Sequence, residues 1–133
     1  MENQKIEKII LVDAINSLIN RDGTVFQEMH ELLEEFPNKK IILTGANDEQ
    51  FEKFNLHKAP YEVFTLKHDP EKIDPQYYRT MLARYGLQAT NAVYFEHDPA
   101  AVESAGSVGI LTYSYDHEER DLGALRHFLE AEI

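Results

Sequence analysis

The sequence of 133 residues is 43% hydrophobic and 28% charged, the composition of a globular protein large enough for one hydrophobic core. Its formal net charge of −11 argues against a surface that binds nucleic acid or an anionic membrane, and its lack of cysteine excludes disulfides, thiolate catalysis and cysteine zinc sites. The N-terminal residues MENQKIEK are too polar for a signal peptide and no apolar run approaches the ~20 residues of a membrane span, so we expect a cytoplasmic protein with a single domain at 1–133.

Five short apolar runs alternate with segments of helical periodicity along the chain. Near-continuous apolar runs rich in β-branched residues are typical of strands that are buried on both faces. In chain order the sequence predicts a strand at Ile6–Val12, a helix at Gln27–Phe36, a strand at Lys40–Leu43, a weaker helix at Asn47–Phe54, a strand at Tyr61–Leu66, a helix at Pro75–Tyr85, a strand at Ala92–Phe95, a helix at Ala100–Ala105, a strand at Val108–Thr112 and a helix at Asp121–Ala131.

This alternation predicts a three-layer α/β fold of the Rossmann-like type, with a parallel five-stranded sheet between two layers of helices. Parallel neighbours need a crossover connection, which the helices supply. In such sheets ligands lie beyond the carboxyl ends of the strands. The candidate functional residues are therefore those that follow the apolar runs: Asp13, Thr44, the segment from Lys67, Glu96 to Asp98, and the segment from Tyr113.

Two overlapping segments, LVDAINSLI and LINRDGTVF, each combine an apolar run with an acidic residue and a turn former. The first follows the strongest strand signal, so Asp13 is expected at the end of a central strand. In the second, Asp22 and Gly23 form a favoured two-residue hairpin turn, and we expect SLI and TVF to pair as a small hairpin. An element order that began at Asn20 rather than at Asp13 would leave a tight interval for a hairpin, a helix and a strand before Thr44.

Four segments resemble, in order, the motifs of the haloacid dehalogenase-like (HAD) hydrolases. VDAINSLI is similar to the first motif, hhhDxDG[TV]L[IV], with Asp13 at the nucleophile and Ser17 at the threonine. IILT, which ends at Thr44, resembles the second motif, and KIDP, which begins at Lys72, resembles the KPDP of the third. AVYFEHDPAAVESAGSVGI resembles the fourth motif and the helix that follows it. The resemblance covers roughly residues 6–115.

The resemblance implies phosphoryl transfer in which Asp13 attacks phosphorus in line and forms an aspartyl-phosphate. Thr44 and the backbone N–H of Gly45 would bind the phosphate, and Lys72 would neutralise charge on the phosphoryl group and on Asp13. A Mg²⁺ cofactor would be held by Asp13, by the backbone carbonyl of Ile15 and by an acid of the fourth motif.

Two positions depart from the family pattern. Ile15 replaces the second aspartate, which protonates the leaving group and is worth ~10²–10⁴-fold in rate, although dehalogenases and phosphonatases of the family also lack it. His97 replaces the aspartate that ligates Mg²⁺, an ion that prefers oxygen. Either neighbour, Glu96 or Asp98, is a candidate substitute ligand, and Ala101 stands where a further acid is usual. The active site is therefore degenerate in its acid/base and metal half.

Purely structural roles also suit these residues. Asp13 could cap the turn after its strand, and Asp98 could cap the helix that Pro99 opens. The other histidines show no ligand spacing and are expected at the surface or in the core: His30, His57, His68, His117 and His127.

No cap domain is expected. Family members carry caps after the first motif or between the second and third motifs, and here both intervals are filled by core elements. A site without a cap is open to solvent, which suits a macromolecular phosphorylated substrate or a partner subunit that supplies a lid. A homo-oligomer is compatible with this arrangement.

Two functions of different class follow. One is a Mg²⁺-dependent phosphohydrolase that acts through Asp13 and lacks the general acid/base at Ile15. The other is a non-catalytic HAD-like domain that binds a phosphorylated ligand or a protein partner at the old active site. Transfer chemistry on a non-phosphate substrate is a third, weaker hypothesis.

Overall fold

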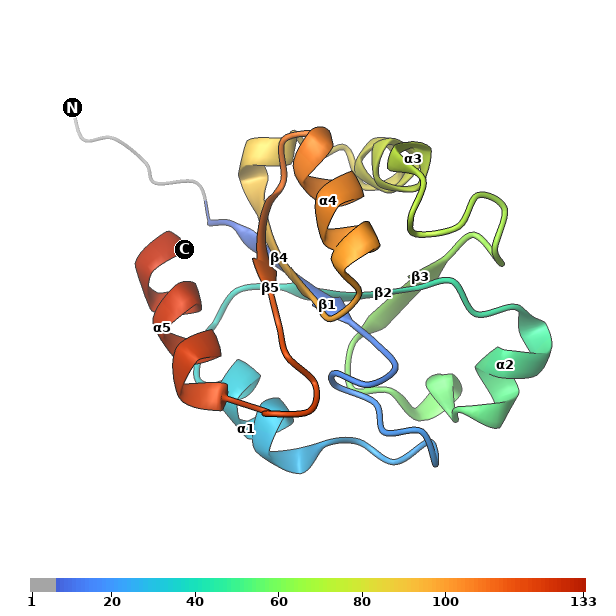
Figure 1. Ribbon diagram of the computed structural model, residues 1–133, viewed down its shortest axis with the longest axis horizontal. Coiled ribbons are helices and arrows are strands. Elements are labelled where there is room, and N and C mark those ends of the chain that lie inside the picture. Colours follow the sequence, from blue (N-terminus) through green and yellow to red (C-terminus); the bar gives the residue numbers. More distant parts are fainter. Residues whose placement is uncertain (1–6) are drawn as a thin grey trace.

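Five parallel strands form the central sheet of the computed structural model, which describes residues 7–133 (Figure 1). The strand order is β3-β2-β1-β4-β5, so the chain moves outward from β1 to one side and then returns to the other. Ligand crevices of such sheets lie at this reversal, outside the carboxyl ends of the strands. The strands are β1 (Ile9–Asp13), β2 (Lys40–Thr44), β3 (Glu62–Thr65), β4 (Ala92–Glu96) and β5 (Leu111–Ser114).

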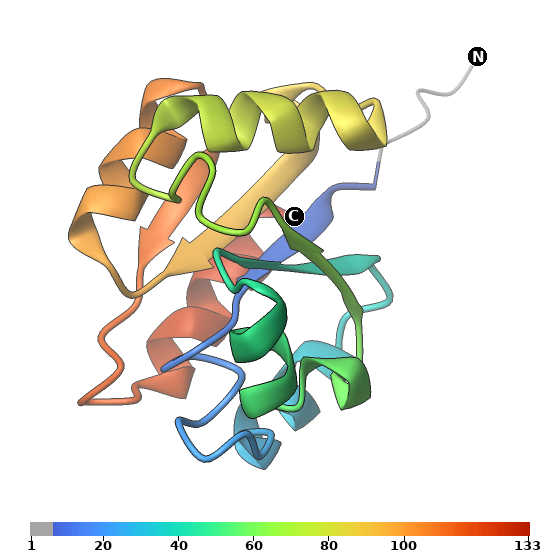
Figure 2. The same ribbon diagram turned by 90° about the vertical axis from the view of Figure 1, so that its right-hand side faces the viewer.

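Helices cover both faces of the sheet (Figures 1 and 2). Side chains alternate between the faces of β1: Ile10 and Val12 pack in the core with α1 and α5, whereas Leu11 packs with α3 and α4. The helices are α1 (Gln27–Glu34), α2 (Asp48–Lys53), α3 (Pro75–Tyr85), α4 (Pro99–Ser107) and α5 (Leu122–Glu132), and two short 3-10 helices lie at η1 (Leu56–Lys58) and η2 (Ala89–Asn91). The predicted α/β fold with a parallel five-stranded sheet is confirmed.

The ends of α3 agree with the sequence signals. Asp74 caps the helix by accepting a hydrogen bond from the Gln76 N–H at 2.9 Å, and Pro75 occupies the first turn. Gly86 ends the helix in the left-handed conformation, with φ of 63°.

The strand expected at Val108–Thr112 begins three residues later than its apolar pattern suggested, at Leu111. The chain first has to leave α4: the Ile110 N–H donates to the Ala105 carbonyl at 3.2 Å, and Gly109 takes a left-handed φ of 96°. Val108 and Ile110 are apolar because they pack in the core beside the end of α4. Residue Ile6 of the first predicted strand lies outside the described residues.

The hairpin predicted after the first motif is present as a short antiparallel bridge between Ile19 and Val25. The Gly23 N–H donates to the Asn20 carbonyl at 2.9 Å, which closes the expected turn. Asp22 accepts a hydrogen bond from the Thr24 N–H at 3.0 Å. The more family-like sequence, DGT, is therefore a turn, and Asp13 is the acidic residue at the end of the central strand.

The intervals in which a cap could be inserted are filled in the described part of the chain. The hairpin, α1 and β2 occupy the first interval, while α2, η1 and β3 occupy the second. Among residues 7–133, none of the helices has the length and hydrophobicity needed to span a bilayer. The assignment of the whole chain, 1–133, to a single domain stays a prediction.

Candidate active site

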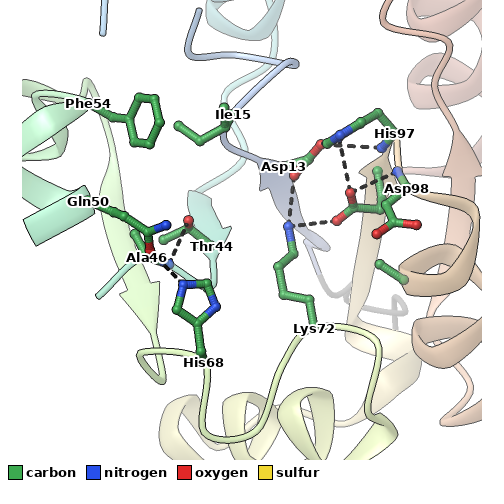
Figure 3. A pocket seen from close by; sticks show the side chains of 13 residues that line it. Asp13, Ile15, Thr44, Ala46, Gln50, Phe54, His68, Lys72, His97 and Asp98 are labelled. Atoms are coloured by element: carbon green, nitrogen blue, oxygen red, sulfur yellow. Dashed lines mark hydrogen bonds and ion pairs between the residues drawn. The ribbon is translucent and has the colours of Figure 1, made fainter. Parts of the chain in front are cut away.

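The neighbouring strands β2, β1 and β4 end at one edge of the sheet with Thr44, Asp13 and Glu96. Figure 3 shows Asp13 and Thr44 at this edge. A cavity of about 210 Å³ lies at this edge. Its lining combines residues from both halves of the chain: Asp13, Ile15, Thr44, Gly45, Ala46, Gln50, Phe54, His68, Lys72, Glu96, His97, Asp98 and Ala101. The candidate catalytic, phosphate-binding and metal-binding residues of the motifs all line this cavity, whereas Ser17 contacts Asp13 without lining it.

Asp13 is buried, yet its carboxylate is fully hydrogen-bonded. Oδ1 accepts from the Lys72 Nζ at 2.8 Å, and Oδ2 accepts from the Ser17 hydroxyl at 2.7 Å and the His97 backbone N–H at 3.3 Å. Burial by itself raises the pKa of Asp13, but Lys72 and His97 together lower it by more, to well below the ordinary value. Asp13 is therefore ionised at neutral pH.

Lys72 reaches the site from the loop before α3. Its Nζ lies 2.8 Å from Asp13 Oδ1, 2.7 Å from Glu96 Oε1 and 3.2 Å from the Leu43 carbonyl oxygen. Burial acts to lower the pKa of the ammonium, but the charges of Asp13 and Glu96 hold it well above the usual value. Lys72 is a largely buried cation, charged at neutral pH, that lies between two acids.

His97 lies on the other side of the same two acids. Its Nδ1 is hydrogen-bonded to Asp13 Oδ2 and lies 3.3 Å from Glu96 Oε2. These two contacts raise the pKa of His97 to about 10, although burial opposes the shift. The ring also packs edge-on against His117, with centroids 4.9 Å apart. We call Asp13, Glu96, Lys72 and His97 the charge ring, because each of its two cations bridges both of its two acids.

The structure separates the roles of the two candidate acids of the fourth motif. Glu96 is 1% exposed and points into the charge ring, where it also accepts a hydrogen bond from the Tyr94 hydroxyl. Asp98 lines the cavity, but its carboxylate caps α4 by accepting from the Ala100 N–H at 3.0 Å.

The loop after β2 forms the opposite wall. The Thr44 hydroxyl accepts a hydrogen bond from the Ala46 N–H at 3.2 Å, and the Thr44 carbonyl accepts from the buried Tyr77 hydroxyl at 2.7 Å. A Cβ at Gly45 would lie 3.1 Å from the His68 ring, so the glycine allows this ring to approach the loop closely. Thr44 and Gly45 therefore lie where the motif comparison expected them.

Three lining residues carry no signal in the sequence: Ala46, Gln50 and Phe54. His68 is exposed, as expected of a surface histidine, and it also lines the cavity, where its Nε2 lies 2.6 Å from Gln50 Oε1 and its Nδ1 is paired with Glu71. Lys67 and His68 both have positive φ, of 55° and 64°, a conformation that a helix or strand pattern cannot reveal. Phe54 and Ile15 contribute apolar surface to the wall.

Within the described residues, Asp13, Glu96 and His97 offer three ligand atoms that lie within 4.8 Å of one another, a spacing that a metal ion can bridge. The chemistry of this set does not fit Mg²⁺ held as the family motif implies. One of the three ligand atoms is an imidazole nitrogen, whereas Mg²⁺ prefers oxygen. The carboxylate oxygens that would bind the ion are paired with Lys72 and His97. Whether the Ile15 carbonyl takes part stays a prediction.

The similarity of this chain to known proteins lies in its structure. No protein-family model and no curated protein matches the sequence. A HAD family enzyme from Bacteroides thetaiotaomicron aligns over 91% of this chain and 98% of its own, with a TM-score of 0.71 and 14% identity. The structure of that enzyme with magnesium and inorganic phosphate aligns over 81% and 93%, with a TM-score of 0.63 and 13% identity. A hydrolase from Streptococcus pneumoniae TIGR4 aligns over 80% of this chain and 58% of its own, with a TM-score of 0.62 and 18% identity.

At sequence identities this low, structural similarity establishes the fold alone. The chemistry has to be argued from the residues of this chain. The five-stranded parallel sheet with helices on both faces matches the architecture of these structures. The chain has the haloacid dehalogenase-like fold.

Proposed function

We propose that the cavity over Asp13 binds the phosphoryl group of a phosphorylated compound. The observation that carries the proposal is the convergence of a buried cation, Lys72, with the loop at Thr44 and Gly45 around one small cavity. An ammonium and backbone N–H groups are the donors that phosphate oxygens require.

The fold neighbours support a phosphoryl ligand, because one of them is a HAD family enzyme in complex with magnesium and inorganic phosphate. The absence of a cap in the described chain supports an open site. We therefore propose a ligand whose phosphoryl group is presented from a larger molecule, or a partner protein that covers the cavity.

Hydrolysis through Asp13 is the second candidate, and the carboxylate geometry favours it. Oδ2 accepts hydrogen bonds from Ser17 and from His97, whereas among residues 7–133 Oδ1 has Lys72 as its one hydrogen-bond donor. Oδ1 is thus the oxygen available for attack on phosphorus, which would form an aspartyl-phosphate as the bond to the leaving oxygen breaks. Ile15 cannot protonate that oxygen, so we expect turnover to be slower by ~10²–10⁴-fold than with an acid at this position.

Titration with inorganic phosphate, followed by calorimetry, tests the binding proposal. We expect phosphate to bind the wild type, and Lys72→Met and Thr44→Val to weaken binding. Lys58→Met is the matched control, because Lys58 is exposed on η1. Thr44 does not belong to the charge ring. Thr44→Val therefore still tests phosphate binding if Lys72→Met does not fold. Equal affinity in the wild type and Thr44→Val, or no binding to the wild type, would contradict the proposal.

A phosphatase screen with Asp13→Asn as control separates binding from hydrolysis. The hydrolytic candidate predicts slow release of phosphate from aryl phosphates and phosphopeptides that disappears in Asp13→Asn, together with a ³²P-labelled protein after acid quenching. Phosphate binding without any of this turnover would leave the binding function alone.

A further inference from the structure

We propose that Lys72 and His97 together replace the divalent cation at this site, so that the cavity binds its phosphoryl group without Mg²⁺. The statement about phosphate rests on the proposed function, whereas the statement about Mg²⁺ does not.

The first step concerns the two acids. Asp13 and Glu96 lie at the ends of the neighbouring strands β1 and β4, and each is 1% exposed. Two carboxylates buried side by side are unfavourable unless positive charge lies between them. A divalent cation between the acids is one solution to this problem.

The second step concerns what this chain places there. Lys72 Nζ contacts Oδ1 of Asp13 and Oε1 of Glu96, at 2.8 and 2.7 Å. His97 Nδ1 contacts the other oxygens, Oδ2 of Asp13 and Oε2 of Glu96. Every carboxylate oxygen of the pair therefore faces a cationic side chain, and the four charges sum to zero.

The third step concerns the position of His97 itself. His97 stands at the fourth-motif position where the family pattern places an acid. A histidine here offers no negative ligand to a metal ion, and its Nδ1 instead contacts the carboxylates of Asp13 and Glu96. Two contacts hold His97 in this place. Its backbone N–H donates to Asp13 at 3.3 Å, and its imidazole packs edge-on against His117. Mg²⁺ would have to displace this ring and then lie beside Lys72, so both ligand supply and charge oppose its binding.

The fourth step concerns the ligand. Lys72 and His97 line the cavity together with Thr44 and Gly45 (Figure 3). A phosphoryl group in the cavity therefore meets two cationic side chains and backbone N–H groups that all belong to the chain.

Calorimetric titration of the phosphate-free protein with Mg²⁺ tests the replacement directly. We expect His97→Asp to bind Mg²⁺ at least about tenfold more tightly than the wild type does, the size of effect typical around metal sites. His127→Asp makes the same replacement of a histidine by an aspartate on an exposed face of α5 and should behave like the wild type. If His97→Asp does not fold, His97→Asn supplies an amide oxygen, and its melting temperature should rise with Mg²⁺ while that of the wild type does not. Wild-type protein that binds Mg²⁺ as tightly as these variants would overturn the proposal.

Phosphate titrations in EDTA and in Mg²⁺ test the second half. We expect the same affinity in both buffers for the wild type and a dependence on Mg²⁺ in His97→Asp. Phosphate binding that requires Mg²⁺ in the wild type would overturn the proposal. Phosphate binding in neither buffer would remove the proposed function, while the Mg²⁺ titration would still decide the cation replacement.

Discussion

Asp13 and Glu96 show how strongly single side chains depend on their partners at this site. Both carboxylates are buried, and each is compensated by Lys72 on one side and His97 on the other. Removing one partner of a buried ion pair typically costs about 3–5 kcal/mol, because the remaining charge is left uncompensated. Variants at these four positions therefore need a stability measurement beside every functional one.

Ile15 provides a cleaner test at the residue scale, because it lines the cavity without belonging to the charge ring. In Ile15→Asp we expect faster phosphate release, by about 10²-fold or more, since an acid at this position can protonate the leaving group. The check is steady-state turnover of an aryl phosphate. Ile15→Asn is the matched control, because it introduces polarity of similar size without a transferable proton, and equal rates in the two variants would contradict the acid/base interpretation.

The hairpin after β1 connects elements that are distant in sequence. Gly23, at its turn, lies against the segment after α2: the Asn55 side-chain amide donates to the Gly23 carbonyl at 3.5 Å. Phe54, the neighbour of Asn55, lines the cavity. The hairpin thus supports one wall of the candidate site.

Two glycine substitutions measure this contact. Gly23→Ala should lower the free energy of unfolding by about 2–4 kcal/mol, from a left-handed backbone and overpacking together, because its φ is 85° and a Cβ would lie 2.6 Å from Asn55 Nδ2. Gly86→Ala, with φ of 63° and no atom within 4 Å of a Cβ, should cost only the backbone part, about 1–2 kcal/mol. Urea denaturation gives both values. Equal losses would show that the hairpin contact contributes nothing.

At the scale of the whole molecule, a chain of net charge −11 keeps a balanced set of charges at the reversal point of its sheet. The acids come from the ends of β1 and β4, and Lys72 comes from the loop before α3. Global unfolding separates these groups, so the pH dependence of stability reports on the ring.

The stability that His97 contributes should decrease as pH rises. Its pKa is raised from 6.5 to about 10 in the folded protein, so the contribution is complete below pH 6.5 and is lost as pH approaches 10. The pKa of Asp13 is lowered from 3.8, so its contribution is present above pH 3.8 and is lost as pH falls below that value. Urea unfolding of the wild type and His97→Asn from pH 6 to 10 tests the first part: the difference between them should shrink with pH. A constant difference would contradict the ion pairing of His97.

Local sequence patterns determined the helices and strands and their order along the chain. Apolar runs predicted four of the five strands within a few residues, and helical spacing predicted α3 with its observed bounds. The fifth strand was placed too early, because Val108 and Ile110 are apolar for a contact made by α4. The strand signal before Asp13 and the turn signal at Asp22 and Gly23 are both local properties of the sequence. Local patterns are therefore enough to place the first motif at Asp13 and not at the DGT turn.

Tertiary structure alone decided how the charges of the site are paired and which further residues line the cavity. Lys72 and His97 meet Asp13 across 59 and 84 residues of chain, and no local pattern states which oxygen each will face. The same holds for the choice of Glu96 over Asp98, and for His68, which an irregular loop carries into the cavity. Periodicity and turn chemistry act between neighbours in sequence, whereas burial and ion pairing act between neighbours in space.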